Sequence, residues 1–103
     1  MSHIDKAADA LSPHRPIMIV DDEESILLAI DTTLRMAGMS NVITCNDSRL
    51  VSDILAGQPV ELMLLDLNMP YIHGERLLDE INRNHPEIPV IIVTGAVDVV
   101  TAV

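Results

Sequence analysis

The stretch that decides the fold is residues 17–24, which read IMIVDDEE. Its four leading apolar residues predict a short strand that is buried on both faces, as strands are in a parallel sheet. Asp21 and Asp22 follow at once and therefore stand at the carboxyl end of that strand. The acidic run continues into a helical pattern, where negative side chains suit the positive end of the helix dipole. A buried strand leading directly into a helix is therefore expected.

The same alternation of strand and helix continues along the chain. Apolar runs predict strands at 17–20, 42–45, 60–65 and 90–93. Apolar residues at helical spacing predict helices up to about residue 35, from 46 or 47 to 57, and from about 75 to 84, with a further helix beginning at 98–103. Because crossovers between parallel strands are right-handed, this rhythm predicts an α/β fold with a doubly wound parallel sheet.

Composition narrows the class of protein. The chain has 103 residues, which suits one domain, and its 49% apolar content excludes intrinsic disorder. The single cysteine excludes an internal disulfide framework and indicates a reducing compartment. A net charge of −10 argues against direct nucleic-acid binding, which needs a basic patch.

The two ends of the chain carry different patterns. Residues 1–15 are polar and rich in Ala, so we expect an N-terminal tail or linker there and the folded domain at 16–103. The N-terminus lacks the pattern of a secretory signal, and no apolar run approaches the ~20 residues of a membrane-spanning helix. These patterns indicate a soluble cytoplasmic domain without a membrane partner.

Polar side chains follow three of the predicted strands. Asp21 and Asp22 come after the first strand, Asp66 after the third and Thr94 after the fourth. Functional groups of parallel sheets collect at the carboxyl ends of the strands. Clustered carboxylates repel one another unless a cation lies between them, and ligand sets of oxygen alone favour Mg²⁺ or Mn²⁺. A helix cap remains an equally good explanation of Asp22 taken alone.

Four segments together resemble the receiver domain of two-component response regulators. They are IVDDE (19–23), LLDLNMP (64–70), Gly74 and PVIIVTG (89–95). The resemblance covers residues 17–103 and implies a flavodoxin-like sheet with strand order 2-1-3-4-5. The ending TGAVDVVTAV (94–103) is similar to receivers that precede σ54-type activator domains.

The resemblance implies a role for each matching residue. Asp66 would be the phosphoacceptor, and Thr94 would donate its hydroxyl group to the phosphoryl group as a switch. The metal ion, Mg²⁺ or Mn²⁺, would be held by Asp21, Asp22, Asp66 and the backbone carbonyl of Asn68. The implied partners are a sensor histidine kinase and an output domain that binds DNA. Such a domain is a signalling module, whose own chemistry is limited to its phosphorylation and slow dephosphorylation.

The chain departs from the family pattern at its C-terminal side. The fifth βα unit, with its phosphate-binding Lys and switch aromatic residue, is missing from the 103 residues. Two interpretations stay open, a piece of a longer regulator or a degenerate receiver. Either way the run 90–93 would become an unprotected sheet edge. We therefore expect the chain to form a homodimer, to exchange its C-terminal segment with a second copy, or to aggregate.

Two other functions also fit a strand-end aspartate. A phosphotransferase or phosphatase of the haloacid dehalogenase type uses such a nucleophile with Mg²⁺ but needs a second Asp two positions later. That position is Asn68, which cannot protonate a leaving group. An interaction module that never becomes phosphorylated is the other alternative.

Overall fold

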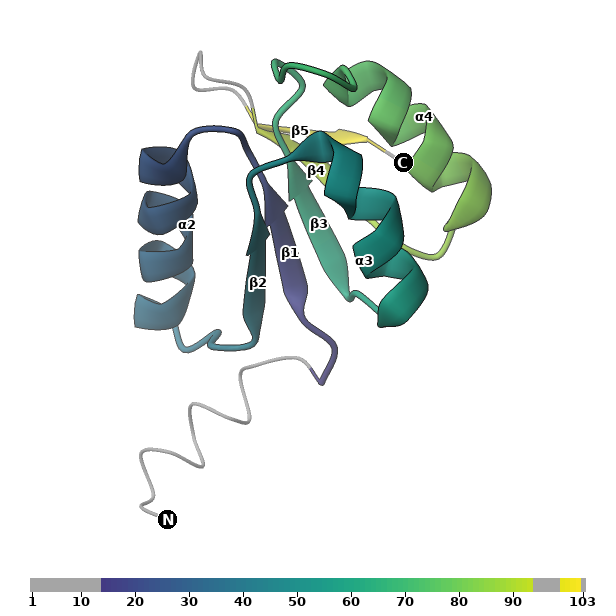
Figure 1. Ribbon diagram of the computed structural model, residues 1–103. Helices are drawn as coiled ribbons and strands as arrows, with labels where there is room; N and C mark the ends of the chain where they lie inside the picture. Colours follow the sequence, from purple (N-terminus) through teal and green to yellow (C-terminus); the bar gives the residue numbers. More distant parts are fainter. Residues whose placement is uncertain (1–13, 94–98, 103) are drawn as a thin grey trace.

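The computed structural model describes residues 14–93 and 99–102. Its elements alternate between strand and helix along most of the chain (Figure 1). They are β1 (Ile17–Val20), α2 (Glu24–Met36), β2 (Val42–Cys45), the short 3₁₀ helix η1 (Ser48–Leu50), α3 (Val51–Gly57), β3 (Leu62–Leu65), α4 (Gly74–Asn84), β4 (Val90–Val93) and β5 (Val99–Ala102). The bounds expected for the first, second and fourth strands are confirmed.

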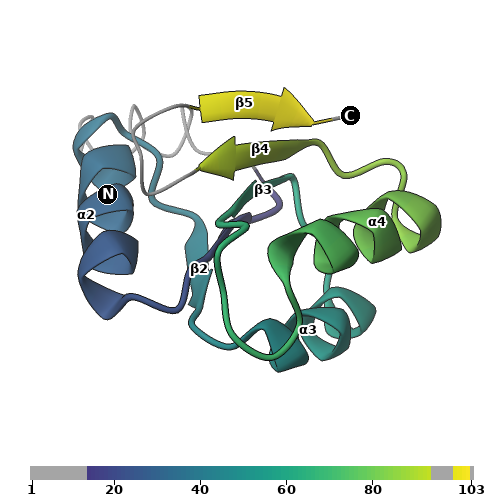
Figure 2. The ribbon, with the colours of Figure 1, turned by 90° about the horizontal axis from the view of Figure 1, so that it is seen from above.

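The strands form one sheet in the order β2-β1-β3-β4-β5. Neighbours from β2 to β4 are parallel, whereas β5 pairs antiparallel with β4. Helix α2 lies on one face of this sheet, and α3 and α4 lie together on the other (Figures 1 and 2). The expected doubly wound, flavodoxin-like arrangement is therefore confirmed. No helix among the described residues is long and apolar enough to cross a membrane.

The main core lies between the sheet and the pair α3 and α4. Alternate residues of β1, β3 and β4 point into it and meet the apolar stripes of the two helices. Seven of its most deeply buried side chains are Met18, Val20, Val51, Met63, Leu65, Leu77 and Val90. These aliphatic and thioether groups fill the layer without any aromatic residue, and they hold the ends of β1 and β3 at a fixed level.

The C-terminal expectations need correction. Residues 99–102 are strand β5 rather than the expected start of a helix, with Val100 aligned with Ile92 of β4. Val99, Val100 and Thr101 are β-branched, which favours a strand. The outer side of β4 also offers unpaired backbone groups for such a strand. The expectation that 90–93 forms an open edge is consequently wrong, since β5 covers it.

Some expectations fall on residues that the structure does not describe. Residues 1–13 make up most of the expected tail, and residues 94–98 include Thr94.

The third strand begins at Leu62 rather than at residue 60. Before it starts, the backbone already joins the sheet, because the Glu61 N–H donates to the Pro16 carbonyl at 2.8 Å.

Candidate functional site

The central strands bring Asp21 and Asp66 to one edge of the sheet. Val20 of β1 is aligned with Leu65 of β3, so the next residue of each strand emerges at the same level. The Asp66 N–H donates to the Val20 carbonyl at 3.0 Å, and the Asp21 N–H donates to the Cys45 carbonyl of β2 at 3.1 Å. Strand pairing thus fixes the backbone of both aspartates.

Three carboxylates meet at this edge. One oxygen each from Asp21, Asp22 and Asp66 can be chosen so that all three atoms lie within 4.8 Å of one another. Asp21 and Asp66 are 6% and 9% exposed, whereas Asp22 is exposed to solvent. The site therefore combines two buried carboxylates with one exposed carboxylate, and a small ligand can reach it from the exposed side.

Local hydrogen bonds hold the two buried carboxylates in place. Oδ1 of Asp21 accepts the Glu23 N–H at 2.9 Å, and Oδ1 of Asp66 accepts the Asn68 N–H at 3.0 Å. In each case the aspartate bonds to the backbone two residues later, so the turn that follows the strand sets the carboxylate orientation.

The electrostatics of the cluster are unfavourable without a counter-ion. The pKa of Asp21 is raised from 3.8 to about 6, mainly by burial and also by the neighbouring charges of Asp66, Asp22 and Glu23, while the hydrogen bond from the Glu23 N–H opposes the change. A cation at this point would relieve both the burial of charge and the mutual repulsion. Because every donor is an oxygen atom, the residues fit a hard divalent ion such as Mg²⁺.

The loop between β3 and α4 depends on a close approach at Gly74. The Gly74 N–H donates to the Leu67 carbonyl at 3.1 Å. A Cβ at Gly74 would lie 2.8 Å from the Asp66 carbonyl oxygen and even closer to the Leu67 Cα. Glycine is therefore required where α4 begins directly against the backbone that follows β3. We call residues 67–73 the acceptor loop, after the phosphoacceptor role that the sequence resemblance implies for Asp66.

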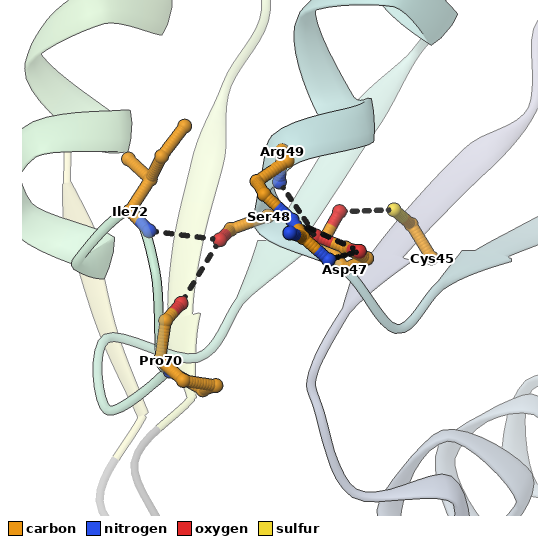
Figure 3. A network of polar contacts seen from close by, with 6 residues as sticks. All are labelled: Cys45, Asp47, Ser48, Arg49, Pro70 and Ile72. Carbon is orange, nitrogen blue, oxygen red and sulfur yellow. Dashed lines mark hydrogen bonds and ion pairs between the residues drawn. The ribbon is translucent and has the colours of Figure 1, made fainter.

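A second contact to the acceptor loop comes from η1, and no sequence pattern indicates this contact. The Ser48 hydroxyl donates to the Pro70 carbonyl at 3.1 Å and accepts the Ile72 N–H at 3.2 Å (Figure 3). Between these two residues, Tyr71 adopts a left-handed conformation with φ of 67°. The Arg49 guanidinium lies over the Tyr71 ring, 3.7 Å from its centroid.

Three further expectations concern Asn68, Thr94 and the helix cap that follows β2. Asn68 lies beside Asp66 through its backbone N–H, and the role of its carbonyl as a metal ligand stays a prediction. Thr94 lies outside the described residues. Asp47 rather than Asn46 caps the segment after β2, since its carboxylate accepts the Arg49 N–H at 2.9 Å.

Comparison with known proteins matches the chain to one family model. Residues 17–103 match the model described as "Response regulator receiver domain". Among curated relatives, the chain is 38% identical over 85 residues to the "DNA-binding transcriptional regulator NtrC" of Klebsiella pneumoniae. The match covers 82% of this chain and 18% of that protein, so the chain spans about a fifth of the relative's length.

Solved structures show the same architecture. A CheY-like response regulator receiver domain protein from Methanospirillum hungatei is 27% identical, with a TM-score of 0.73, covering 79% of this chain and 64% of the other. The response regulator TrrA from Thermotoga maritima, solved in complex with Mg²⁺ and BeF, is 25% identical, with a TM-score of 0.72. That match covers 78% of this chain and 69% of TrrA.

Proposed function

Because this chain belongs to the response regulator receiver domain family, we propose that it is a phosphoacceptor module that takes a phosphoryl group onto Asp66. The observation that carries the proposal is the position of Asp66, 9% exposed at a strand end and clustered with two further carboxylates. Receiver domains are signalling modules rather than metabolic enzymes, and the proposal keeps to that class.

The proposed reaction is a single phosphoryl transfer. A carboxylate oxygen of Asp66 forms a bond to the phosphorus of a phosphohistidine on a sensor kinase. The phosphorus–nitrogen bond breaks, its electron pair stays on the imidazole, and that ring takes up a proton from solvent. Such transfers depend mostly on positioning and on neutralising charge. The hydrogen bond from the Asn68 N–H to Asp66 supplies part of that positioning.

A divalent ion belongs to the same proposal. Asp21, Asp22, Asp66 and the Asn68 carbonyl would hold Mg²⁺ or Mn²⁺, and the bound ion would supply positive charge against the carboxylates and phosphoryl oxygens. The clustered oxygens and the raised pKa of Asp21 support this assignment. The related TrrA was solved with Mg²⁺ and BeF, which supports it further. Thr94 would donate a hydrogen bond to the phosphoryl group and report its arrival.

The wider setting follows from the relatives. NtrC of Klebsiella pneumoniae is a DNA-binding transcriptional regulator, so we propose that this domain, residues 16–103 after a tail at 1–15, controls an output domain of the σ54-activator type. Contact with DNA would belong to the output domain, since the chain carries a charge of −10. A cytoplasmic location, where a sensor kinase can reach Asp66, completes the proposal.

Mass spectrometry after incubation with acetyl phosphate and Mg²⁺ tests the proposal. We expect one phosphoryl group per chain, and we expect none on Asp66→Asn, whose amide cannot act as the acceptor. Rapid release of inorganic phosphate over many turnovers would instead favour the haloacid dehalogenase type of chemistry, for which Asn68 lacks the acidic group. A chain that binds no phosphoryl group would favour the unphosphorylated interaction module.

A further inference from the structure

Backbone N–H groups form hydrogen bonds that hold the acceptor loop in place at both of its ends. At the start, the Asn68 N–H donates to Asp66, and at the end the Gly74 N–H donates to the Leu67 carbonyl. Within the loop, Met69 is 3% exposed and packs into the main core. The stretch from Pro70 to Ile72 turns outward through the left-handed Tyr71, so it needs an anchor from elsewhere in the chain.

Ser48 provides that anchor. Its hydroxyl donates to one backbone group of the turn and accepts from another, and the side chain is only 2% exposed. Water cannot readily replace a hydroxyl at such a position. Removing it would leave the Pro70 carbonyl and the Ile72 N–H without this partner, which favours a change in the loop.

Ser48 is itself held firmly from β2 and α3. It begins η1, the short helical turn that Asp47 caps through the Arg49 N–H. The Cys45 thiol donates to the Asp47 carbonyl at 3.1 Å, and the carboxylate of Asp47 pairs with the Arg49 side chain at 2.7 Å (Figure 3). Val51, which follows η1, is fully buried. The hydroxyl therefore extends from a well-packed helical turn toward the stretch from Pro70 to Ile72, which has fewer contacts of its own.

We propose that Ser48 is a positioning residue for metal binding, which it promotes by holding the acceptor loop in the conformation that presents Asn68 beside Asp66. This inference rests on the proposed function, because it assumes a divalent ion among Asp21, Asp22 and Asp66. Ser48 touches none of these ligands, and its effect passes through the loop backbone. The group that it positions is the Asn68 carbonyl, which side-chain substitution at residue 68 cannot remove.

The test compares Mg²⁺ affinity and amide exchange in three proteins by NMR. They are the wild type, Ser48→Ala and Ser52→Ala. Ser52 is a matched control, since it lies in α3, and its hydroxyl donates to Glu80 of α4 at 2.9 Å without reaching the acceptor loop. We expect Ser48→Ala to bind Mg²⁺ about three- to tenfold more weakly, the effect of one lost hydrogen-bond arrangement, and Ser52→Ala to match the wild type.

Amide exchange separates loop positioning from general stability. In Ser48→Ala, the Ile72 amide should exchange faster, whereas the Met63 amide, which bonds to the Pro89 carbonyl at 3.0 Å in the sheet, should change much less. The coupling is reciprocal, so Mg²⁺ should slow exchange at Ile72 in the wild type. This last measurement needs no variant and therefore holds even if Ser48→Ala does not fold.

The outcomes distinguish this inference from the proposed function. A wild type that binds no Mg²⁺ would overturn both. Normal Mg²⁺ binding by Ser48→Ala, or exchange at Ile72 in the wild type that does not slow when Mg²⁺ binds, would overturn the positioning role alone. Equal weakening in Ser48→Ala and Ser52→Ala would show a general effect of α3 and would also overturn it.

Discussion

Gly74 lies so close to Leu67 that the space for a side chain at residue 74 is already filled by backbone. The obstructing atoms are the Leu67 Cα and carbonyl carbon and the Asp66 carbonyl oxygen, none of which is the flexible end of a side chain. Helix α4 therefore begins in direct contact with the backbone that leaves β3. The position of α4 and the conformation of the acceptor loop are consequently linked at this one residue.

Gly74→Ala should destabilise the domain by about 1–3 kcal/mol, because the new methyl group forces backbone atoms apart in a packed region. Urea unfolding followed by circular dichroism measures this loss. Gly57→Ala is the matched control, since nothing lies within 4 Å of a Cβ at that position and it ends a helix. There alanine should be neutral or slightly stabilising through its better helix propensity. Equal losses in the two variants would contradict the packing argument.

Mg²⁺ should raise the melting temperature of the domain, since a bound cation offsets the repulsion among the three carboxylates. At a hundred times its dissociation constant, a ligand adds about 2.7 kcal/mol to the unfolding free energy if the unfolded chain does not bind it. Asp22→Ala should abolish this increase while the fold persists, because Asp22 is the exposed member of the cluster. Thermal denaturation with and without Mg²⁺ measures both effects.

Glu23→Gln is the control for Asp22→Ala. It removes a negative charge from the adjacent exposed residue, and that residue is not part of the cluster. The variant should therefore keep most of the response to Mg²⁺. If Glu23→Gln loses the response as fully as Asp22→Ala does, the effect is one of overall charge and the assignment of Asp22 as a ligand is wrong.

The strands were the most predictable part of the fold. Continuous apolar runs such as 17–20 and 90–93 match the observed bounds because strands buried on both faces tolerate few polar residues. The segment 99–102 is a strand, whereas the repeating strand–helix pattern predicts the start of a helix, because that pattern takes no account of the three β-branched residues. The strand preference of these residues and the backbone groups along the outer side of β4 determine the structure of this segment. The alternation of strands and helices before it does not.

The acidic cluster could also be predicted from the sequence, whereas the contacts that hold the neighbouring acceptor loop could not. Aspartates that follow adjacent parallel strands must emerge at one edge, so Asp21 and Asp66 could be paired without a structure. The Ser48 contact could not be foreseen, since a serine in the first turn after a cap has many ordinary uses. The left-handed backbone of Tyr71 likewise has no sequence signal, because glycine or asparagine is the usual residue there.

Strand β5 should promote self-association of the 103-residue chain. It is the outer strand at that side of the described sheet, and its sequence VVTA carries no charge or proline. Thr101→Lys should reduce association, because a lysine on an outer strand opposes pairing with another strand. Sedimentation velocity over a concentration series measures the effect.

Gln58→Lys controls for the added charge, since residue 58 is exposed at the end of α3 and lies away from β5. It should leave association nearly unchanged. A wild-type chain that stays monomeric throughout the series would contradict the prediction, as would equal relief by the two lysine variants.

Asp21 should make the metal-free domain less stable as the pH rises from about 4 to about 6. Burial and the nearby carboxylates raise its pKa from 3.8 to about 6 in the folded chain. Below pH 3.8 the group is protonated whether the chain is folded or unfolded, and its stabilising contribution is fully present. As the pH rises through the folded pKa, that contribution is lost, because the folded chain must then bury a charge that the unfolded chain leaves in water.

Urea unfolding in EDTA should therefore show Asp21→Asn gaining stability relative to the wild type across this interval and holding a constant advantage above it. Glu61→Gln, which neutralises a carboxylate at the opposite end of the sheet, should show no such gain between pH 4 and 6. A wild-type profile that runs parallel to Asp21→Asn throughout would mean that Asp21 titrates at its ordinary pKa.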